Sequence, residues 1–189
     1  MLYKWCNEVK LDVLKVSGKD SVLLFKSGNE TAEVCLEGSD IKEVIYRNGN
    51  NETVIQNNDA HHIVVGDGNA QRDVFHYLKP GGPAPELRLG ITKHRGIGTW
   101  SSLPHGFELN LETGFEEVFF YLIEGGNKRA IQVGEGVWHD GSTVRSSWFV
   151  EDHTFSTIPM GYHPVVGEPE VSVHYIWAYL CKKQEWEKI

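Results

Sequence analysis

The chain has 189 residues and a formal net charge of −8, from 18 basic and 26 acidic side chains. This length suits one ordinary domain with an accessory segment, and a hydrophobic content of 40% excludes wholesale disorder. The acidic balance, with no basic stripe, argues against nucleic acid as a partner.

The start of the chain and its cysteines predict a cytoplasmic protein. The first residues lack the basic start and apolar core of a signal peptide. No apolar run approaches the roughly 18 residues that a membrane helix needs, so no membrane partner is expected. Cys6, Cys35 and Cys181 share no CxxC spacing, which is poor material for a disulfide framework or a zinc cluster and fits a reducing compartment.

Almost every periodic stretch of the sequence has period two, which is typical of strands. Turn sequences separate these stretches, and Asn48-Gly49 is the strongest hairpin signal among them. The expected strands are residues 11–16, 21–26, 33–36, 41–46, 53–56, 61–65, 74–78, 87–93, 117–123, 129–133, 147–150, 155–158 and 171–180. Only the tail, residues 182–189, is predicted to close as a short helix. This pattern predicts an all-β protein built as a sandwich or barrel.

The expected strand 117–123 is apolar on both alternating faces, which predicts that both faces are covered. Glu117 shares one of these faces with Phe119 and Tyr121. A carboxylate in such a place is neutral, paired or bound to a metal, because an isolated buried charge is too costly. The alternative is that Glu117 reaches water at the end of the strand.

Two histidines complete a possible metal-binding pattern. His105 lies before Glu117, and His163 follows it in a turn shaped by Pro159 and Gly161. A His, then a Glu entering a buried strand, then a His in such a turn is the ligand order of the cupin barrel. In that barrel, side chains from separate strands converge on one metal ion.

The segments around these residues resemble the 5-deoxyglucuronate isomerase family of inositol catabolism. They are Trp100-Ser101-Ser102-x-Pro104, Glu116-Glu117-Val118-Phe119-Phe120-Tyr121 and Pro159-x-Gly161-Tyr162-His163-Pro164-Val165. The related 5-keto-4-deoxyuronate isomerases share its fold, and the resemblance covers roughly residues 60–181. It implies an all-β cupin jelly-roll barrel, to which the strands expected in residues 1–58 add an N-terminal β extension. It also implies a divalent metal (zinc, manganese or iron) and the aldose–ketose isomerisation of a uronic-acid-type sugar through an enediolate.

Carried over by motif, the resemblance assigns His105, Glu117 and His163 as metal ligands. The sequence departs from the family at the second His of a His-x-His pair, where an alignment with a one-residue gap places Phe107. An ungapped alignment instead offers Glu108 as an oxygen ligand. Two imidazoles and one carboxylate still suffice to hold iron, manganese or zinc.

Under the isomerase interpretation, a general base moves a proton between two sugar carbons. The candidate bases are Glu108 and either Tyr175 or Tyr179, which lie on one face of the last strand. Lys93 is the candidate for binding a substrate carboxylate. Two other cationic residues remain open for this role: Arg72 and Arg95.

The chain divides into residues 1–58, interpreted as a shortened or degenerate first cupin half, and residues 59–189, interpreted as the cupin barrel. Sheets extended in this way often pair across a two-fold axis, so a homodimer is expected. The favoured function is an isomerase-like enzyme that acts on a sugar acid. One alternative is a non-catalytic cupin that binds a sugar acid with weak metal or none, which Phe107 favours. Another is a non-haem iron oxygenase using the same His/Glu/His set.

Overall fold

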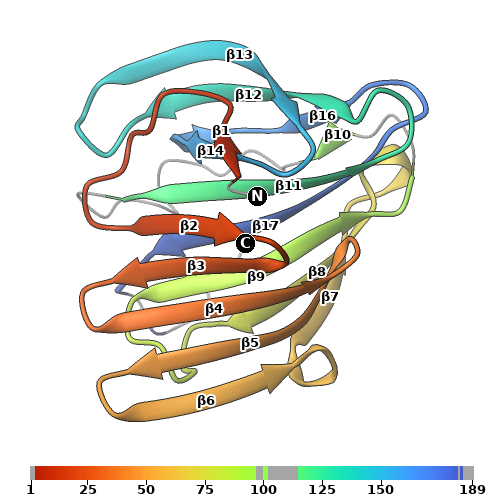
Figure 1. The fold of residues 1–189 in the computed structure, drawn as a ribbon. Coiled ribbons are helices and arrows are strands. Elements are labelled where there is room, and N and C mark those ends of the chain that lie inside the picture. The colour runs from red at the N-terminus through yellow and green to blue at the C-terminus, as the bar shows by residue number, and fades with distance from the viewer. Residues whose placement is uncertain (1–2, 97–99, 102–114, 183, 185–189) are drawn as a thin grey trace.

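Figure 1 shows a computed structural model of the chain, which describes residues 3–96, 100–101, 115–182 and 184. The described residues form strands and two short 3-10 turns, Asn57–Asp59 and Gly68–Ala70, and they contain no α-helix. The all-β prediction is confirmed, while most of the tail expected to be helical lies outside the described residues. Within the described ranges, no helix has the length and apolarity needed to cross a membrane.

The strands fall into three sheets. The N-terminal sheet is a meander of β2 (Lys15–Lys19), β3 (Val22–Ser27), β4 (Glu30–Glu37), β5 (Asp40–Asn48) and β6 (Asn51–Gln56). The central sheet has the order β1 (Lys4–Trp5), β14 (Thr154–Ile158), β11 (Glu117–Glu124), β17 (Ser172–Leu180), β9 (Leu87–His94), β8 (Arg72–Leu78) and β7 (His61–Val65). The outer sheet has the order β10 (Trp100–Ser101), β16 (Val165–Gly167), β12 (Arg129–Val137) and β13 (Thr143–Glu151), with β15 (Met160–Tyr162) also paired to β12.

The central sheet lies between the other two sheets and buries side chains on both faces. Its strand β11 shows this directly, since Val118 and Phe120 pack in a core shared with the N-terminal sheet. Phe119 and Tyr121 point the other way, into a core shared with the outer sheet. We call this second side of the central sheet its barrel face. The prediction that the strand beginning at Glu117 is covered on both faces is confirmed.

The N-terminal sheet forms where the sequence alternates between apolar and polar residues. Its tight turns use glycines in the left-handed region, among them Gly28 at φ 56° and Gly49 at φ 58°, which side chains with a Cβ rarely adopt. Glu30 ties this sheet to the central one, because its buried carboxylate accepts hydrogen bonds from the backbone N–H groups of Glu86 (3.0 Å) and Leu87 (3.2 Å). Figure 1 shows the whole meander stacked beside the barrel.

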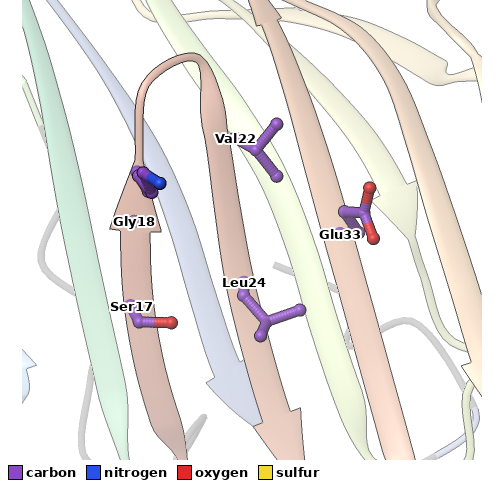
Figure 2. A pocket seen from close by; sticks show the side chains of 6 residues that line it. Ser17, Gly18, Val22, Leu24 and Glu33 are labelled. Carbon is purple, nitrogen blue, oxygen red and sulfur yellow. The ribbon is translucent and has the colours of Figure 1, made fainter. Parts of the chain in front are cut away.

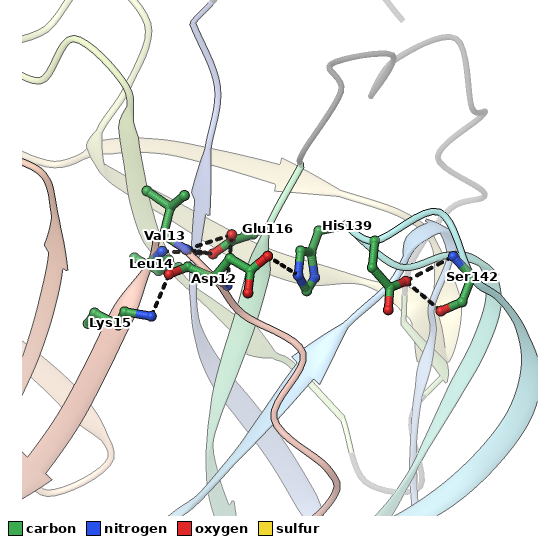
Figure 3. Close-up of polar contacts among 8 residues, drawn as sticks. Asp12, Val13, Leu14, Lys15, Glu116, His139 and Ser142 are labelled. Atoms are coloured by element: carbon green, nitrogen blue, oxygen red, sulfur yellow. Dashed lines mark hydrogen bonds and ion pairs between the residues drawn. The ribbon is translucent and has the colours of Figure 1, made fainter.

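The first predicted strand, residues 11–16, is displaced, since β2 begins only at Lys15. The backbone N–H groups of Asp12, Val13 and Leu14 donate instead to the carboxylate of Glu116, at 2.7 to 3.1 Å (Figure 3). The Asp12 carboxylate adds an ion pair with His139, 3.1 Å from Nε2. A side-chain acceptor therefore replaces a neighbouring strand for these three residues.

Candidate functional site

The site begins with Glu117 at the start of β11. Its register partners are Tyr179 on β17 and Ile158 on β14, so neighbouring strands flank it on both sides. Alternation along β11 places it on the barrel face with Phe119 and Tyr121. The side chain is only 9% exposed, which rules out the alternative that the carboxyl group reaches water freely at the strand end.

His163 lies on the outer-sheet side of the barrel, in the link between β15 and β16. Gly161 precedes it at φ 120°, a backbone conformation that favours glycine and turns the chain. Gln132 on β12 fixes this link, because its Nε2 donates to the carbonyl oxygens of His163 (2.8 Å) and Pro164 (3.2 Å). The imidazole is 3% exposed and meets the ring of Phe119 edge to face, with the ring centroids 5.8 Å apart.

The two predicted ligands meet inside the barrel. Glu117 Oε2 lies 3.7 Å from His163 Nε2, although the residues are 46 positions apart in the chain. Burial raises the pKa of Glu117 from 4.5 to about 8, so in the metal-free protein the carboxyl group retains its proton at neutral pH. A buried acid beside an imidazole is a costly arrangement that a bound cation relieves.

The donor set fits a divalent metal. Bonds of about 2.1 Å from a metal ion to a histidine nitrogen and a carboxylate oxygen span up to about 4.2 Å, so atoms 3.7 Å apart can share one ion. Among the described residues, no group of three or more His, Cys, Asp or Glu side chains lies so that it could hold a metal ion. His105 and Glu108, like Phe107, lie outside the described residues.

The other predicted site residues lie at different depths. Tyr175 is on the barrel face but stacks on Phe119 with ring centroids 4.3 Å apart, four residues along β17 from the partner of Glu117. Tyr179 is that partner and is the tyrosine that flanks Glu117 directly. Lys93 is on the opposite face of the central sheet, where its Nζ lies 2.6 Å from Asp40. The structure therefore does not bring Lys93 together with Glu117.

The two alternative cationic residues are also remote from Glu117. Arg72 is the register partner of His94, the last residue of β9. The register partner of Tyr179 is Arg88, near the other end of that strand. Arg95 forms an ion pair with Asp73 at 2.6 Å. Arg88 is instead the register partner of Tyr179, so Arg88, Tyr179 and Glu117 form one row across three strands. It is 1% exposed, and its guanidinium donates to the Ala84, Leu87 and Pro85 carbonyl oxygens.

A hollow elsewhere on the surface offers no comparable chemistry. It lies on the face of the N-terminal sheet that points away from the barrel, between β2, β3 and β4 (Figure 2). Apolar side chains, Val22 and Leu24, and polar ones, Ser17 and Glu33, both line it. The described residues that line it include no histidine or cysteine and only one carboxylate, so Glu117 and His163 remain the candidate site.

A comparison with protein families bears on this site. The sequence profile of the KduI/IolB family matches residues 29–189, which are most of the chain. The chain belongs to the KduI/IolB family. The matched range contains both Glu117 and His163. The predicted resemblance to these isomerases is thereby confirmed.

Two similar proteins show how much of the chain the likeness covers. A protein of Halalkalibacterium halodurans named 5-deoxy-glucuronate isomerase is 29% identical over 127 residues, which are 65% of this KduI/IolB chain and 46% of that protein. The aligned part thus spans less than half of the relative. A solved IolB-like protein from Salmonella typhimurium has a TM-score of 0.60 at 17% identity, over 98% of this chain and 76% of that one. This likeness shows the fold, and the predicted cupin jelly-roll architecture is confirmed.

The raised pKa of Glu117 predicts a pH-dependent stability for the metal-free KduI/IolB chain. Between pH 4.5 and about 8 the folded protein keeps a proton on Glu117 that the unfolded chain has released. The free energy of unfolding therefore falls as pH rises through this window, by up to about 1.4 kcal/mol per pH unit. Urea denaturation of chelator-treated protein from pH 5 to 8 measures the slope.

Glu117→Gln is the matched control, because glutamine keeps the shape and cannot titrate. Its unfolding free energy is expected to show a shallower fall over the same range. Equal slopes for the two proteins would contradict the raised pKa.

Proposed function

We propose that this protein is a metal-dependent aldose–ketose isomerase-like cupin that acts on a uronic-acid-type sugar. The observation that carries the proposal is the buried contact between Glu117 and His163, 3.7 Å apart. Family membership supports the reaction class, since a relative is named 5-deoxy-glucuronate isomerase. Because the match spans less than half of that relative, substrate and activity remain proposals for this chain.

In this proposal Glu117 and His163 hold the ion, and His105 supplies a third ligand. A divalent cation bound there would act as a Lewis acid on the carbonyl and adjacent hydroxyl of an open-chain sugar. To hold the ion, the Glu117 carboxyl group would have to give up its proton to solvent. Phe119 and Trp177 line the same face and exclude water, which strengthens the electrostatic interactions in the site.

The chain also offers groups for the proton transfer. Isomerisation through an enediolate needs one base that takes a proton from one carbon and returns it to the next. Tyr179 flanks Glu117 in register, and Tyr175 is deeper on the same strand, so we favour Tyr179 of the two. Glu108 is the carboxylate candidate. Arg88, in the row of Tyr179 and Glu117, adds positive charge near an anionic sugar.

The remaining expectations concern the whole molecule. We propose that residues 1–58 are a degenerate first cupin half, since β2–β6 form a sheet of their own that packs on the central sheet. We propose a homodimer, because sheets extended in this way commonly pair across a two-fold axis. We also propose a cytoplasmic location.

The direct experiment combines metal analysis with a ketose assay. Protein purified without chelator is expected to carry one divalent ion per chain at this site, whether zinc, manganese or iron, and to convert a 5-deoxyglucuronate-type aldose into a ketose. Chelation should abolish turnover and the same metal should restore it. Metal-free protein that fails to bind added zinc, manganese or iron would overturn the enzyme proposal.

Phe107 favours one second function, a non-catalytic cupin that binds a sugar acid. A phenylalanine at the second His position of the family's pattern offers no metal ligand. Sugar-acid binding without turnover, with or without metal, would support this function. Oxygen uptake with ferrous iron would support the oxygenase instead.

A further inference from the structure

A second pair of histidines lies on the barrel face at the edge of the central sheet. His61 on β7 and His76 on β8 are register partners in an antiparallel pair. Both point to the barrel face, because His76 meets Trp177 with ring centroids 5.3 Å apart and His61 meets His76. Gly90 on β9 lies between His76 and Trp177 in register, and a Cβ there would overlap the Trp177 ring. The absence of a side chain at Gly90 therefore lets Trp177 reach His76.

The spacing of the two imidazoles suits a shared metal ion. Their ring centroids are 5.8 Å apart and their planes are inclined by 49°. With metal–nitrogen bonds of about 2.1 Å and a ring radius of about 1.2 Å, two imidazoles on one ion have centroids up to about 6.5 Å apart. The observed spacing falls within this limit.

The hydrogen bonding of His76 favours ligation through the other nitrogen. Its Nδ1 lies 3.3 Å from the backbone carbonyl oxygen of His61, so Nδ1 carries the proton and Nε2 carries the lone pair. A carbonyl acceptor on one imidazole nitrogen is the usual way in which proteins orient a histidine that binds a metal through the other.

The partly buried ring of His76 and the exposed ring of His61 each suit this arrangement. Burial lowers the pKa of His76 to about 4, which keeps its imidazole neutral at physiological pH. A neutral imidazole is the form that binds metals. His61 is exposed, so an ion has access to the pair from solvent.

We propose that His61 and His76 form a cross-strand binding site for one transition-metal ion of the zinc class. Imidazole nitrogens suit zinc, copper and nickel, whereas magnesium and calcium require oxygen ligands. Two protein ligands leave the remaining positions of a tetrahedral ion to water or to a ligand in the barrel.

This site is distinct from the one at Glu117. The register row from His76 runs through Gly90 and Trp177 to Phe119, two residues past Glu117 on β11. With strands about 4.8 Å apart, His76 and Phe119 are separated by about 14 Å along the sheet. One ion cannot bridge the two sites, and the proposal stands whether or not the isomerase function holds.

The test is zinc binding by chelator-treated, full-length protein in equilibrium dialysis. His61→Ala and His76→Ala are each expected to lose one equivalent of bound zinc or to weaken its binding at least tenfold. His62→Ala is the matched control, because His62 lies on the opposite face, stacked on Phe75 at 4.4 Å and 2.6 Å from Asp73. It should bind as much zinc as the wild type, and magnesium should not compete.

Zinc binding that is the same in all four proteins would overturn the proposal. Because Ala at position 76 leaves a gap beside Trp177, His76→Gln provides a better-packed variant, and circular dichroism checks folding. As a second measurement, zinc should shift the imidazole NMR resonances of His61 and His76 and leave that of His62 in place. Zinc shifts confined to other histidines would also contradict the site.

Discussion

Replacing His163 by alanine is expected to weaken metal binding at the Glu117 site and to lower ketose formation by about 100-fold or more. Loss of a partner that only orients a ligand already costs about 10–100-fold in metal affinity or activity, and His163 is a ligand in the proposal. Metal content and initial rates of ketose formation measure both effects.

The fold should survive this substitution. Gln132 bonds to the backbone carbonyl of His163, not to its ring, so the link between β15 and β16 keeps its anchor in the variant. His163→Gln, which better fills the space beside Phe119, separates loss of the ligand from loss of packing. Both variants should lose metal together with activity.

The matched control for this prediction is His153→Asn. The His153 ring stacks against Phe120, on the face of the central sheet opposite to Glu117. Its backbone has φ 58°, a left-handed value that asparagine tolerates better than most residues. The control should retain metal and turnover. Equal activity of the wild type and His163→Ala would contradict the assignment of His163.

Replacing Glu116 by alanine is expected to lower the free energy of unfolding by about 3 kcal/mol. Glu116 is 2% exposed, and its carboxylate accepts hydrogen bonds from the backbone N–H groups of Asp12, Val13 and Leu14 (Figure 3). Each buried donor left without an acceptor costs about 1–3 kcal/mol. Residues 12–14 can detach from the sheet in the variant so that water hydrates their amides, which limits the total loss of stability. Detachment also exposes Leu14, a fully buried core side chain, and this adds to the loss.

Urea denaturation measures this effect, and amide hydrogen exchange locates it. Exchange of the Asp12, Val13 and Leu14 amides should accelerate in the variant, while the amides of β11 and β17 change only with global stability. Glu135→Ala is the control, because that carboxylate is exposed and lies 3.7 Å from Arg145. It should cost less than about 0.5 kcal/mol. A Glu116→Ala loss as small as this would contradict the anchoring role.

The sequence predicted the strands well because period-two alternation and glycine turns are local signals. It placed β7, β9, β11 and β17 within a few residues of their observed bounds. It misplaced the start of β2, because the acceptor for residues 12–14 is a side chain more than 100 positions away. The strand predicted over residues 147–150 is shorter than β13, because most residues of β13 are exposed and do not alternate between apolar and polar types.

For the site, the order of His, Glu and His along the chain, together with the family resemblance, singled out Glu117 and His163 as candidates. A carboxylate at the edge of a two-faced apolar strand and a histidine in a Pro-x-Gly turn are both unusual in sequence. The role of Gln132 left no such signal, since one glutamine inside an expected strand is ordinary. Its contact with the His163 link appears only when β12 and the link pair in the folded sheet.

Lys93 shows the opposite failure. Its alternation with Leu89 and Ile91 was read correctly, but the sequence could not say which face of β9 borders the barrel. The structure turns that face toward the N-terminal sheet, where Lys93 pairs with Asp40. The other face of β9 carries Arg88, Gly90, Thr92 and His94, and the strand is buried on both faces, so alternation alone did not show which face borders the barrel.

The central claim is that Glu117 and His163 bind one divalent cation, and anomalous diffraction tests it most directly. Crystals grown with zinc, manganese or ferrous iron are expected to show an anomalous peak about 2.0–2.2 Å from a Glu117 carboxylate oxygen and from His163 Nε2. The same crystals of His163→Ala should lack it. Crystals in which these two side chains stay in direct contact, with no peak between them at saturating metal, would contradict the account.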